Sequence, residues 1–165
     1  MIQEPSDELN VLRTNLSTEI ENSNIRLNDI LVKDSSDNVI PLQEFFKKGQ
    51  NVILVYRFSE MNCESCVSYS IHTLLQWIDS IDKDNILFLG AYRNNKIFNR
   101  QKPLYGIHEF NVANTPNLNL PAENIGYPYY FVLDSTLNVS NLFVPDKGFP
   151  QLNNAYLKNI KKRYF

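Results

Sequence analysis

The sequence combines a moderate length with a nearly balanced charge, and together these exclude several classes of protein. Its 165 residues, of which 43% are hydrophobic and 12% aromatic, can bury a full core, and the length predicts one domain. A formal net charge of -2 gives no basic footprint for nucleic acid, and no apolar run is long enough to cross a bilayer. We therefore expect neither nucleic-acid binding nor a transmembrane segment in this chain.

Residues 1–24 form a polar N-terminal segment in which aliphatic side chains recur at helical spacing, namely Leu9, Leu12, Leu16 and Ile20. We expect either an amphipathic helix or a spacer, with no part in the chemistry. The start of the segment lacks the basic and apolar regions of a secretory signal, which favours a cytoplasmic protein. The alternative is a mature form from which a signal or a lipid anchor has been removed, and both remain open.

The pattern of the next hundred residues predicts a hairpin followed by a βαβ unit. Residues 25–42 read as a β-hairpin with its turn at 34–38, followed by a short helix that Gly49 closes. The runs 52–58 and 85–92 are almost continuously apolar, which is typical of strands buried on both faces of a parallel sheet. A helical pattern from Cys66 to about Ile81 lies between them and completes the unit.

The two cysteines of the chain lie at the junction between this strand and this helix, in the motif Cys63-Glu64-Ser65-Cys66. A cysteine that begins a C-x-x-C motif at a helix N-terminus commonly has its pKa lowered from about 8.5 to roughly 3.5–7.5, since unpaired backbone N–H groups stabilise the thiolate. One helical turn brings the second thiol within reach of the first. We therefore interpret Cys63 as the attacking thiol and Cys66 as the resolving thiol.

The remainder of the chain is irregular at first and regular at its end. Residues 93–126 have no strong periodicity, and a segment of this kind between two core strands is a plausible specificity insertion. Residues 129–134 and 139–144 predict an antiparallel hairpin, and a closing helix is expected from about Pro150 to Arg163.

Two motifs, together with this order of elements, give the chain a family resemblance over residues 25–165. The first is the C-x-x-C motif at the strand-to-helix junction, and the second is Tyr127-Pro128 at the start of the penultimate strand. The chain resembles the thioredoxin-like superfamily, in its TlpA-type or redoxin branch. The resemblance implies an α/β fold with a central mixed β-sheet flanked by helices and an N-terminal β-hairpin. It also implies that Pro128 follows a cis bond and faces the dithiol, with Tyr127 lining the substrate groove.

The chain departs from the usual pattern of this family at several positions. Asn62 and Ser65 stand where members usually carry tryptophan and proline, so no reduction potential can be carried over, given that such dithiols span about -270 to -120 mV. Glu64 places a carboxylate beside the sulfur, and we expect it to oppose thiolate formation. The position of the buried proton-relay acid holds Arg57. Glu60 could substitute for that acid, although a solvent-facing glutamate is the simpler interpretation.

Other functions are compatible with parts of this pattern. The two cysteines supply only two of the four ligands of a zinc site, and His72 and His108 are the remaining nitrogen donors. His72 lies off the helical stripe that includes Cys66 and reads as a surface residue, so a metal-binding domain is the lesser alternative. A peroxiredoxin needs threonine and proline at set positions before its cysteine, and this chain has neither residue there. A copper chaperone of this fold needs a wider spacing of the cysteines than the one found here. A thioredoxin-fold binding module that keeps a dithiol without turnover is the main alternative.

The sequence thus predicts a thiol-disulfide oxidoreductase that exchanges disulfides with protein substrates and with an upstream redox partner. It predicts a monomer and no metal site, and it calls for no cofactor because the two thiols carry the electrons. The family resemblance implies a periplasmic or periplasm-facing, membrane-anchored protein, with a cytoplasmic location as the alternative.

Overall fold

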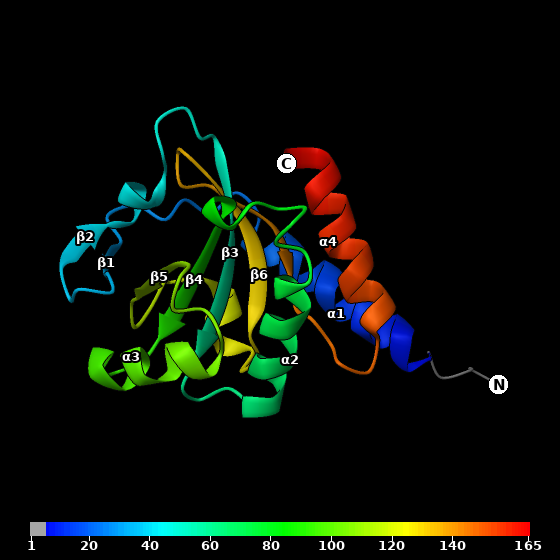
Figure 1. Ribbon diagram of the computed structural model, residues 1–165. Helices are drawn as coiled ribbons and strands as arrows, with labels where there is room; N and C mark the ends of the chain where they lie inside the picture. Colours follow the sequence, from blue (N-terminus) through cyan, green and yellow to red (C-terminus); the bar gives the residue numbers. More distant parts are fainter. Residues whose placement is uncertain (1–5) are drawn as a thin grey trace.

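A seven-stranded mixed sheet forms the centre of the computed structural model, which describes residues 6–165 (Figure 1). The strands are β1 (Leu31–Lys33), β2 (Val39–Pro41), β3 (Val52–Ser59), β4 (Ile86–Ala91), β5 (Asn111–Asn114), β6 (Tyr129–Asp134) and β7 (Val139–Phe143). The helices are α1 (Asp7–Asn22), α2 (Glu64–Leu75), α3 (Asn95–Leu104) and α4 (Pro150–Tyr164), with short 3₁₀ turns η1 (Leu42–Phe45), η2 (Lys83–Asn85) and η3 (Pro121–Asn124).

The order of strands across the sheet is β2-β1-β5-β4-β3-β6-β7. β3 pairs in parallel with β4, and α2 connects them, which confirms the predicted βαβ unit. Both predicted hairpins are also present, as the antiparallel pairs β1–β2 and β6–β7. Because β3 lies between two neighbours in the middle of the sheet, its carboxyl end places the residues that follow it at a fixed point of the fold.

The two faces of the sheet bury separate apolar clusters. One cluster is covered by α2, α3 and α4, with Leu74, Phe98 and Leu157 among its side chains. The other is covered by the N-terminal hairpin, η1 and the loops around η3. Burial on both faces explains why β3 and β4 read as continuous apolar runs rather than as alternating patterns.

Helix α1 buries its polar face, although its sequence pattern suggests that the aliphatic face should be buried. Its aliphatic stripe is exposed, with Leu16 at 62% and Ile20 at 68% of their accessible surface, whereas Asn15 and Asn22 are buried. The Asn15 side chain accepts from the backbone N–H of Val144 (2.7 Å) and donates to its carbonyl (3.2 Å). α1 therefore closes the β7 edge of the sheet through polar side chains that pair with backbone groups.

Two segments differ from the sequence-based expectations. Helix α2 ends at Leu75, six residues before the predicted end, because the Trp77 N–H turns back to the carbonyl of Leu74 and the chain continues as turns to the buried Ile81. The irregular segment 93–126 contains α3, the strand β5 and η3. β5 is parallel to β4, so part of the expected insertion belongs to the central sheet.

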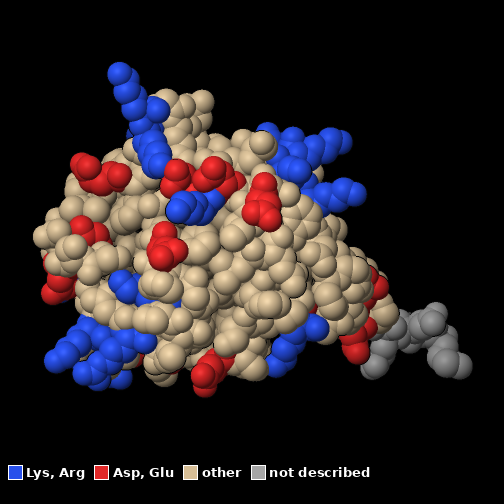
Figure 2. Space-filling view, in the orientation of Figure 1, with Lys and Arg blue, Asp and Glu red and all other residues tan. Residues whose placement is uncertain are grey.

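The surface carries mixed charge. On the face shown in Figure 2, lysine and arginine side chains are interspersed with aspartate and glutamate. Within residues 6–165, none of the helices combines the length and the apolar character that a membrane span requires.

Candidate functional site

Cys63 is the N-cap of α2, directly after the loop that leaves the central strand β3. Its sulfur accepts a hydrogen bond from the backbone N–H of Cys66 at 3.3 Å and lies 3.2 Å from the hydroxyl oxygen of Ser65. The hydrogen bond from the Cys66 thiol, followed by those from Ser65 and from the Cys66 N–H, lowers the pKa of Cys63 to about 7. Cys63 is exposed, so a substantial fraction of it is an accessible thiolate near neutral pH.

Cys66 has the opposite electrostatic environment. It is partly covered, and burial, together with the hydrogen bond that its thiol gives to Cys63, raises its pKa. Both cysteines are free thiols in this structure. An exposed thiolate followed one turn later by a covered thiol is the arrangement in which the first sulfur attacks and the second resolves.

Ser65 connects the dithiol to a cation that the sequence did not indicate. The Nζ atom of Lys147 donates to Ser65 Oγ at 2.8 Å, which leaves the Ser65 hydroxyl hydrogen free to point at the Cys63 sulfur. The charge of Lys147 also contributes to the lowered pKa of Cys63 and partly offsets the rise in the pKa of Cys66. Ser65, at the position where the family usually has proline, thus takes part in a short chain from ammonium to hydroxyl to sulfur.

The loop that carries Lys147 is held by the buried side chain of Asn153 in α4. Asn153 accepts from the N–H of Asp146 (3.0 Å) and donates to its carbonyl (2.8 Å). The same amide also donates to the hydroxyl of Tyr69 in α2 (2.8 Å). These contacts tie the loop between β7 and α4 to the helix that begins with the dithiol, so the backbone that bears Lys147 is fixed relative to Cys63.

Tyr127 and Pro128 occupy different environments. Tyr127 is 56% exposed and, together with Cys66, lines a cavity beside the dithiol that is described below. Pro128 is buried and lines neither that cavity nor the smaller hollow next to Arg57. The expected cis bond before Pro128 is wrong, because every peptide bond in the part of the chain that the structure describes is trans. The chain bends on either side of Gly126, whose φ of +77° glycine adopts without strain.

Asn62, where the family usually has tryptophan, joins the dithiol loop to this turn. Its Nδ2 donates to the carbonyl of Gly126 at 3.0 Å, and its Oδ1 accepts from the N–H of Ser59 at 2.8 Å. The side chain therefore fixes the loop before Cys63 to the residue before Tyr127, across 64 positions of sequence.

The two acidic residues near the motif have separate places. Glu60 accepts from the backbone N–H and from Nε of Arg93 (3.1 and 2.9 Å), and the backbone bond, followed by the side-chain bond, lowers its pKa. This pairing holds Glu60 ionised at neutral pH and favours a structural ion pair over a proton relay. Glu64 is exposed in the first turn of α2, and its expected effect on the thiolate stays a prediction.

Arg57 is buried beneath the site and is neutralised by a residue that sequence reasoning missed. It is 2% exposed and forms a two-pronged ion pair with Glu123, with N–O distances of 2.9 and 2.8 Å. Its remaining guanidinium nitrogen donates to the carbonyls of Gly90 and Thr115, and the hydroxyl of Tyr129 donates to Glu123. Arg57 stands inside an apolar strand, and a charge in that position indicates a buried ion pair. The sequence near Arg57 does not show that its partner is Glu123.

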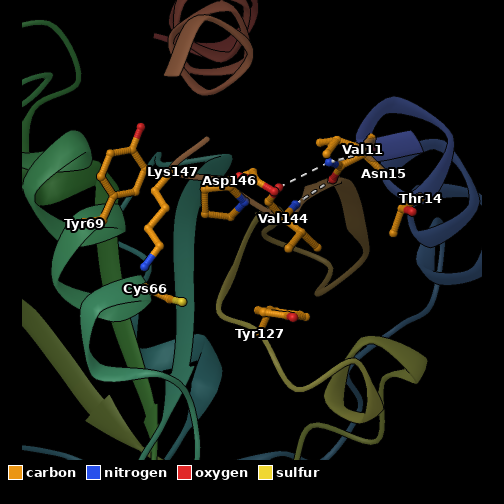
Figure 3. Close-up of a pocket in the computed structure, with 10 residues that line it drawn as sticks. Val11, Thr14, Asn15, Cys66, Tyr69, Tyr127, Val144, Asp146 and Lys147 are labelled. Atoms are coloured by element: carbon orange, nitrogen blue, oxygen red, sulfur yellow. Dashed lines mark hydrogen bonds between the residues drawn. The ribbon is translucent and has the colours of Figure 1, made fainter. Parts of the chain in front are cut away.

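A cavity of about 280 Å³ lies beside the dithiol, between α2, the loop after β7 and α1 (Figure 3). The sulfur of Cys66 and the ring of Tyr127 both face this space in the close-up view. A second hollow of about 30 Å³, with room for one or two water molecules, is lined by Arg57, Asn62 and Glu123.

The histidines do not join the cysteines in a group that could bind a metal ion. His72 is exposed, with its Nε2 3.3 Å from the side chain of Gln76. Within residues 6–165, no three side chains of histidine, cysteine, aspartate or glutamate are grouped closely enough to hold a metal ion.

Comparison with solved structures identifies the fold. The thioredoxin domain of a thiol-disulfide oxidoreductase from Bacteroides vulgatus superimposes with a TM-score of 0.64 at 13% identity, covering 87% of this chain and 98% of that one. A thiol:disulfide interchange protein from Bacteroides sp. gives 0.59 at 14% identity, covering 86% and 90%. A peroxidoxin from Mycobacterium tuberculosis gives 0.58 at 9% identity, covering 84% and 97%.

These matches confirm the thioredoxin-like fold. No protein-family model matches the sequence, and no curated protein sequence does either. At such low identity the likeness is one of fold, so the chemistry has to be argued from the site.

Proposed function

We propose that this protein is a thiol-disulfide oxidoreductase that exchanges disulfides with protein substrates through Cys63 and Cys66. The observation that carries the proposal is the division between the two thiols. Cys63 is exposed with a pKa of about 7, and Cys66 is partly covered with a raised pKa. A pair that is poised in this way can make and resolve a mixed disulfide in one order only.

In the reducing direction, the Cys63 thiolate attacks one sulfur of a substrate disulfide. The substrate S–S bond breaks, a bond forms between Cys63 and that sulfur, and the second substrate sulfur leaves as a thiolate that takes up a proton. Cys66 then loses its proton and attacks Cys63, which releases the first substrate sulfur and closes the Cys63–Cys66 disulfide. Two electrons pass to the substrate, and an upstream dithiol protein must return them. A substrate dithiol would drive the same steps in reverse.

The surroundings of Cys63 support a protein as the substrate. Met61 is 83% exposed and Tyr127 is 56% exposed, so two large apolar side chains flank an accessible sulfur. Exposed apolar groups beside a reactive centre are typical of a surface that a partner protein covers. In this proposal Tyr127 contacts the substrate, and the buried Pro128 supports Tyr127 as its neighbour in the chain.

The resemblance to TlpA-type proteins supports a periplasmic location, either free or attached to the membrane on the periplasmic side. A cytoplasmic location is the alternative. Expression of the protein in its natural host, followed by fractionation of the cells with a marker for each compartment, distinguishes the two.

A trapping experiment tests the exchange reaction. With Cys66→Ser, the mixed disulfide cannot be resolved, so a disulfide-containing protein such as insulin should remain covalently attached to Cys63 and be visible by mass spectrometry. The matched variant Cys63→Ser should form far less adduct, because the remaining thiol is partly covered and has a raised pKa. If neither variant traps a substrate and the wild-type protein reduces none, the protein is a docking domain that keeps the dithiol without turnover.

A further inference from the structure

Helix α1 forms one wall of the cavity beside the dithiol. Val11, Thr14 and Asn15 of α1 bound it on one side, and Cys66 and Tyr127 bound it on the other (Figure 3). α1 is held there by hydrogen bonds between Asn15 and the backbone of Val144. The helix therefore both closes the edge of the sheet and shapes a space that opens at the resolving thiol.

The polar groups around this cavity are largely satisfied by the protein itself. The Asn15 amide is bonded to Val144, the Tyr69 hydroxyl accepts from Asn153, and the Lys147 ammonium donates to Ser65. Both polar atoms of the Asn15 side chain are engaged with Val144, whereas the Lys147 ammonium and the Tyr69 hydroxyl keep hydrogens that they can still donate. An apolar ligand loses nothing and gains contact with the side chains of Val11, Tyr127 and Val144.

The size and position of the cavity indicate what kind of apolar group it takes. Its volume of about 280 Å³ is at the lower end of the roughly 300–1,000 Å³ of small-molecule sites, which suits a side chain rather than a large cofactor. Cys66 lines the cavity while Cys63 lies just outside it, and the two are joined by the 3.3 Å hydrogen bond. A substrate chain bonded to Cys63 therefore starts within one helical turn of a residue that lines the cavity.

We propose that this cavity receives a bulky apolar side chain of the protein substrate, within about two residues of the substrate's reacting cysteine. The proposal deepens the exchange function and rests on it. α1 is then a wall that selects substrates, and the exposed Met61 and Tyr127 are the apolar rim over which the rest of the substrate lies.

A pair of synthetic peptides tests the selection. Each carries one cysteine in a disulfide with thionitrobenzoate, and the two differ only in having leucine or glycine on both sides of that cysteine. Reduced protein releases thionitrobenzoate, which is followed by absorbance, and the rates are divided by those of dithiothreitol with the same peptides. We expect kcat/KM for the leucine peptide to exceed that for the glycine peptide by about tenfold.

Variants of α1 locate the selection in the cavity. Thr14→Trp fills the space from the α1 side, so the ratio of leucine to glycine rates should fall towards one. Arg13→Trp adds the same bulk at an exposed neighbouring position outside the cavity and should keep the ratio. Circular dichroism checks that both variants fold. If Thr14→Trp does not, Tyr127→Ser removes the opposite wall and should lower the ratio in the same way.

The outcomes separate the two proposals. Equal normalised rates for the two peptides in the wild-type protein would overturn the cavity proposal and leave the exchange function intact. A ratio that survives filling of the cavity would overturn it as well, because the selection would then lie elsewhere. If neither peptide releases thionitrobenzoate, the exchange function itself fails.

Discussion

Helices α1 and α2 both carry aliphatic residues at helical spacing, yet they attach to the same sheet by different forces. α2 buries its stripe, with Val67, Ile71 and Leu74 at 2% exposure or less. α1 exposes its stripe and buries asparagine. The comparison teaches that periodicity shows which residues share a face, while the neighbours of the helix decide which face is covered. At an edge strand such as β7, unpaired backbone groups can be better partners for a helix than apolar surface.

The largest effect should come from the apolar attachment of α2. Leu74 is fully buried in the cluster beneath α2, so Leu74→Ala removes its contacts and leaves a cavity. We expect a loss of about 2–5 kcal/mol in the free energy of unfolding, measured by urea denaturation. A loss below about 1 kcal/mol would show that α2 is not held by its apolar stripe.

A smaller but clear effect should come from the polar attachment of α1. Asn22 is fully buried, and its Oδ1 accepts from the N–H of Ala122 at 3.1 Å. Asn22→Ala leaves that buried donor without a partner and should cost about 1–3 kcal/mol in the same measurement. The control Asn10→Ala changes an exposed asparagine of the same helix and should stay within about 0.5 kcal/mol. Equal effects of the two substitutions would contradict the polar attachment.

The exposed stripe of α1 should contribute almost nothing to stability. Leu16→Ser and Ile20→Ser remove side chains that are more than half exposed, so each should change the free energy of unfolding by no more than about 0.5 kcal/mol. A loss above about 2 kcal/mol would mean that the stripe is covered in solution. Sedimentation of both variants and of the wild-type protein would then show whether a second copy covers it.

Helices α1 and α2 also share an N-cap geometry. The difference between their caps should have the smallest effect, which is a change in the reactivity of Cys63 with pH. Ser6 accepts from the N–H of Leu9 at 3.3 Å, and Cys63 accepts from that of Cys66 at the same distance. Only the second cap titrates. With a pKa of about 7, Cys63 should react with iodoacetamide at a rate that is half-maximal near pH 7 and falls as the pH decreases below it, because the thiolate is lost.

Lys147 sharpens this comparison of the caps. Lys147→Met removes a charge that favours the thiolate, so the midpoint of the alkylation profile should move to higher pH and the rate at pH 6 should fall by a few-fold. Lys158→Met removes an exposed lysine of α4 and should leave the profile unchanged. If Lys147→Met leaves the pH profile of alkylation unchanged, the contacts from Lys147 through Ser65 to Cys63 do not influence the thiolate.

Local signals were sufficient for the framework of the fold. Continuous apolar runs predicted β3 and β4, and turn residues predicted both hairpins, because each of these patterns is set by its own segment. The motif at the strand-to-helix junction placed Cys63 at a helix N-terminus for the same reason.

The contacts that sequence reasoning missed join residues far apart in the chain. Lys147 and Ser65 are 82 positions apart, Arg57 and Glu123 are 66 apart, and Asn15 and Val144 are 129 apart. Arg57 alone hinted at a buried pair, because a charge inside an apolar strand requires a partner. The bond before Pro128 is trans, although the family resemblance had suggested the cis form.

The equilibrium reduction potential of the Cys63–Cys66 pair tests the central claim most directly. The protein is equilibrated with glutathione or dithiothreitol at a series of ratios, and the thiols are trapped and counted by mass spectrometry. The proposed function predicts a reversible two-electron couple that connects one intramolecular disulfide with two free thiols, and its value shows whether the protein donates or accepts electrons. Thiols that never form a disulfide under these conditions, or a native mass that includes a zinc ion, would contradict it.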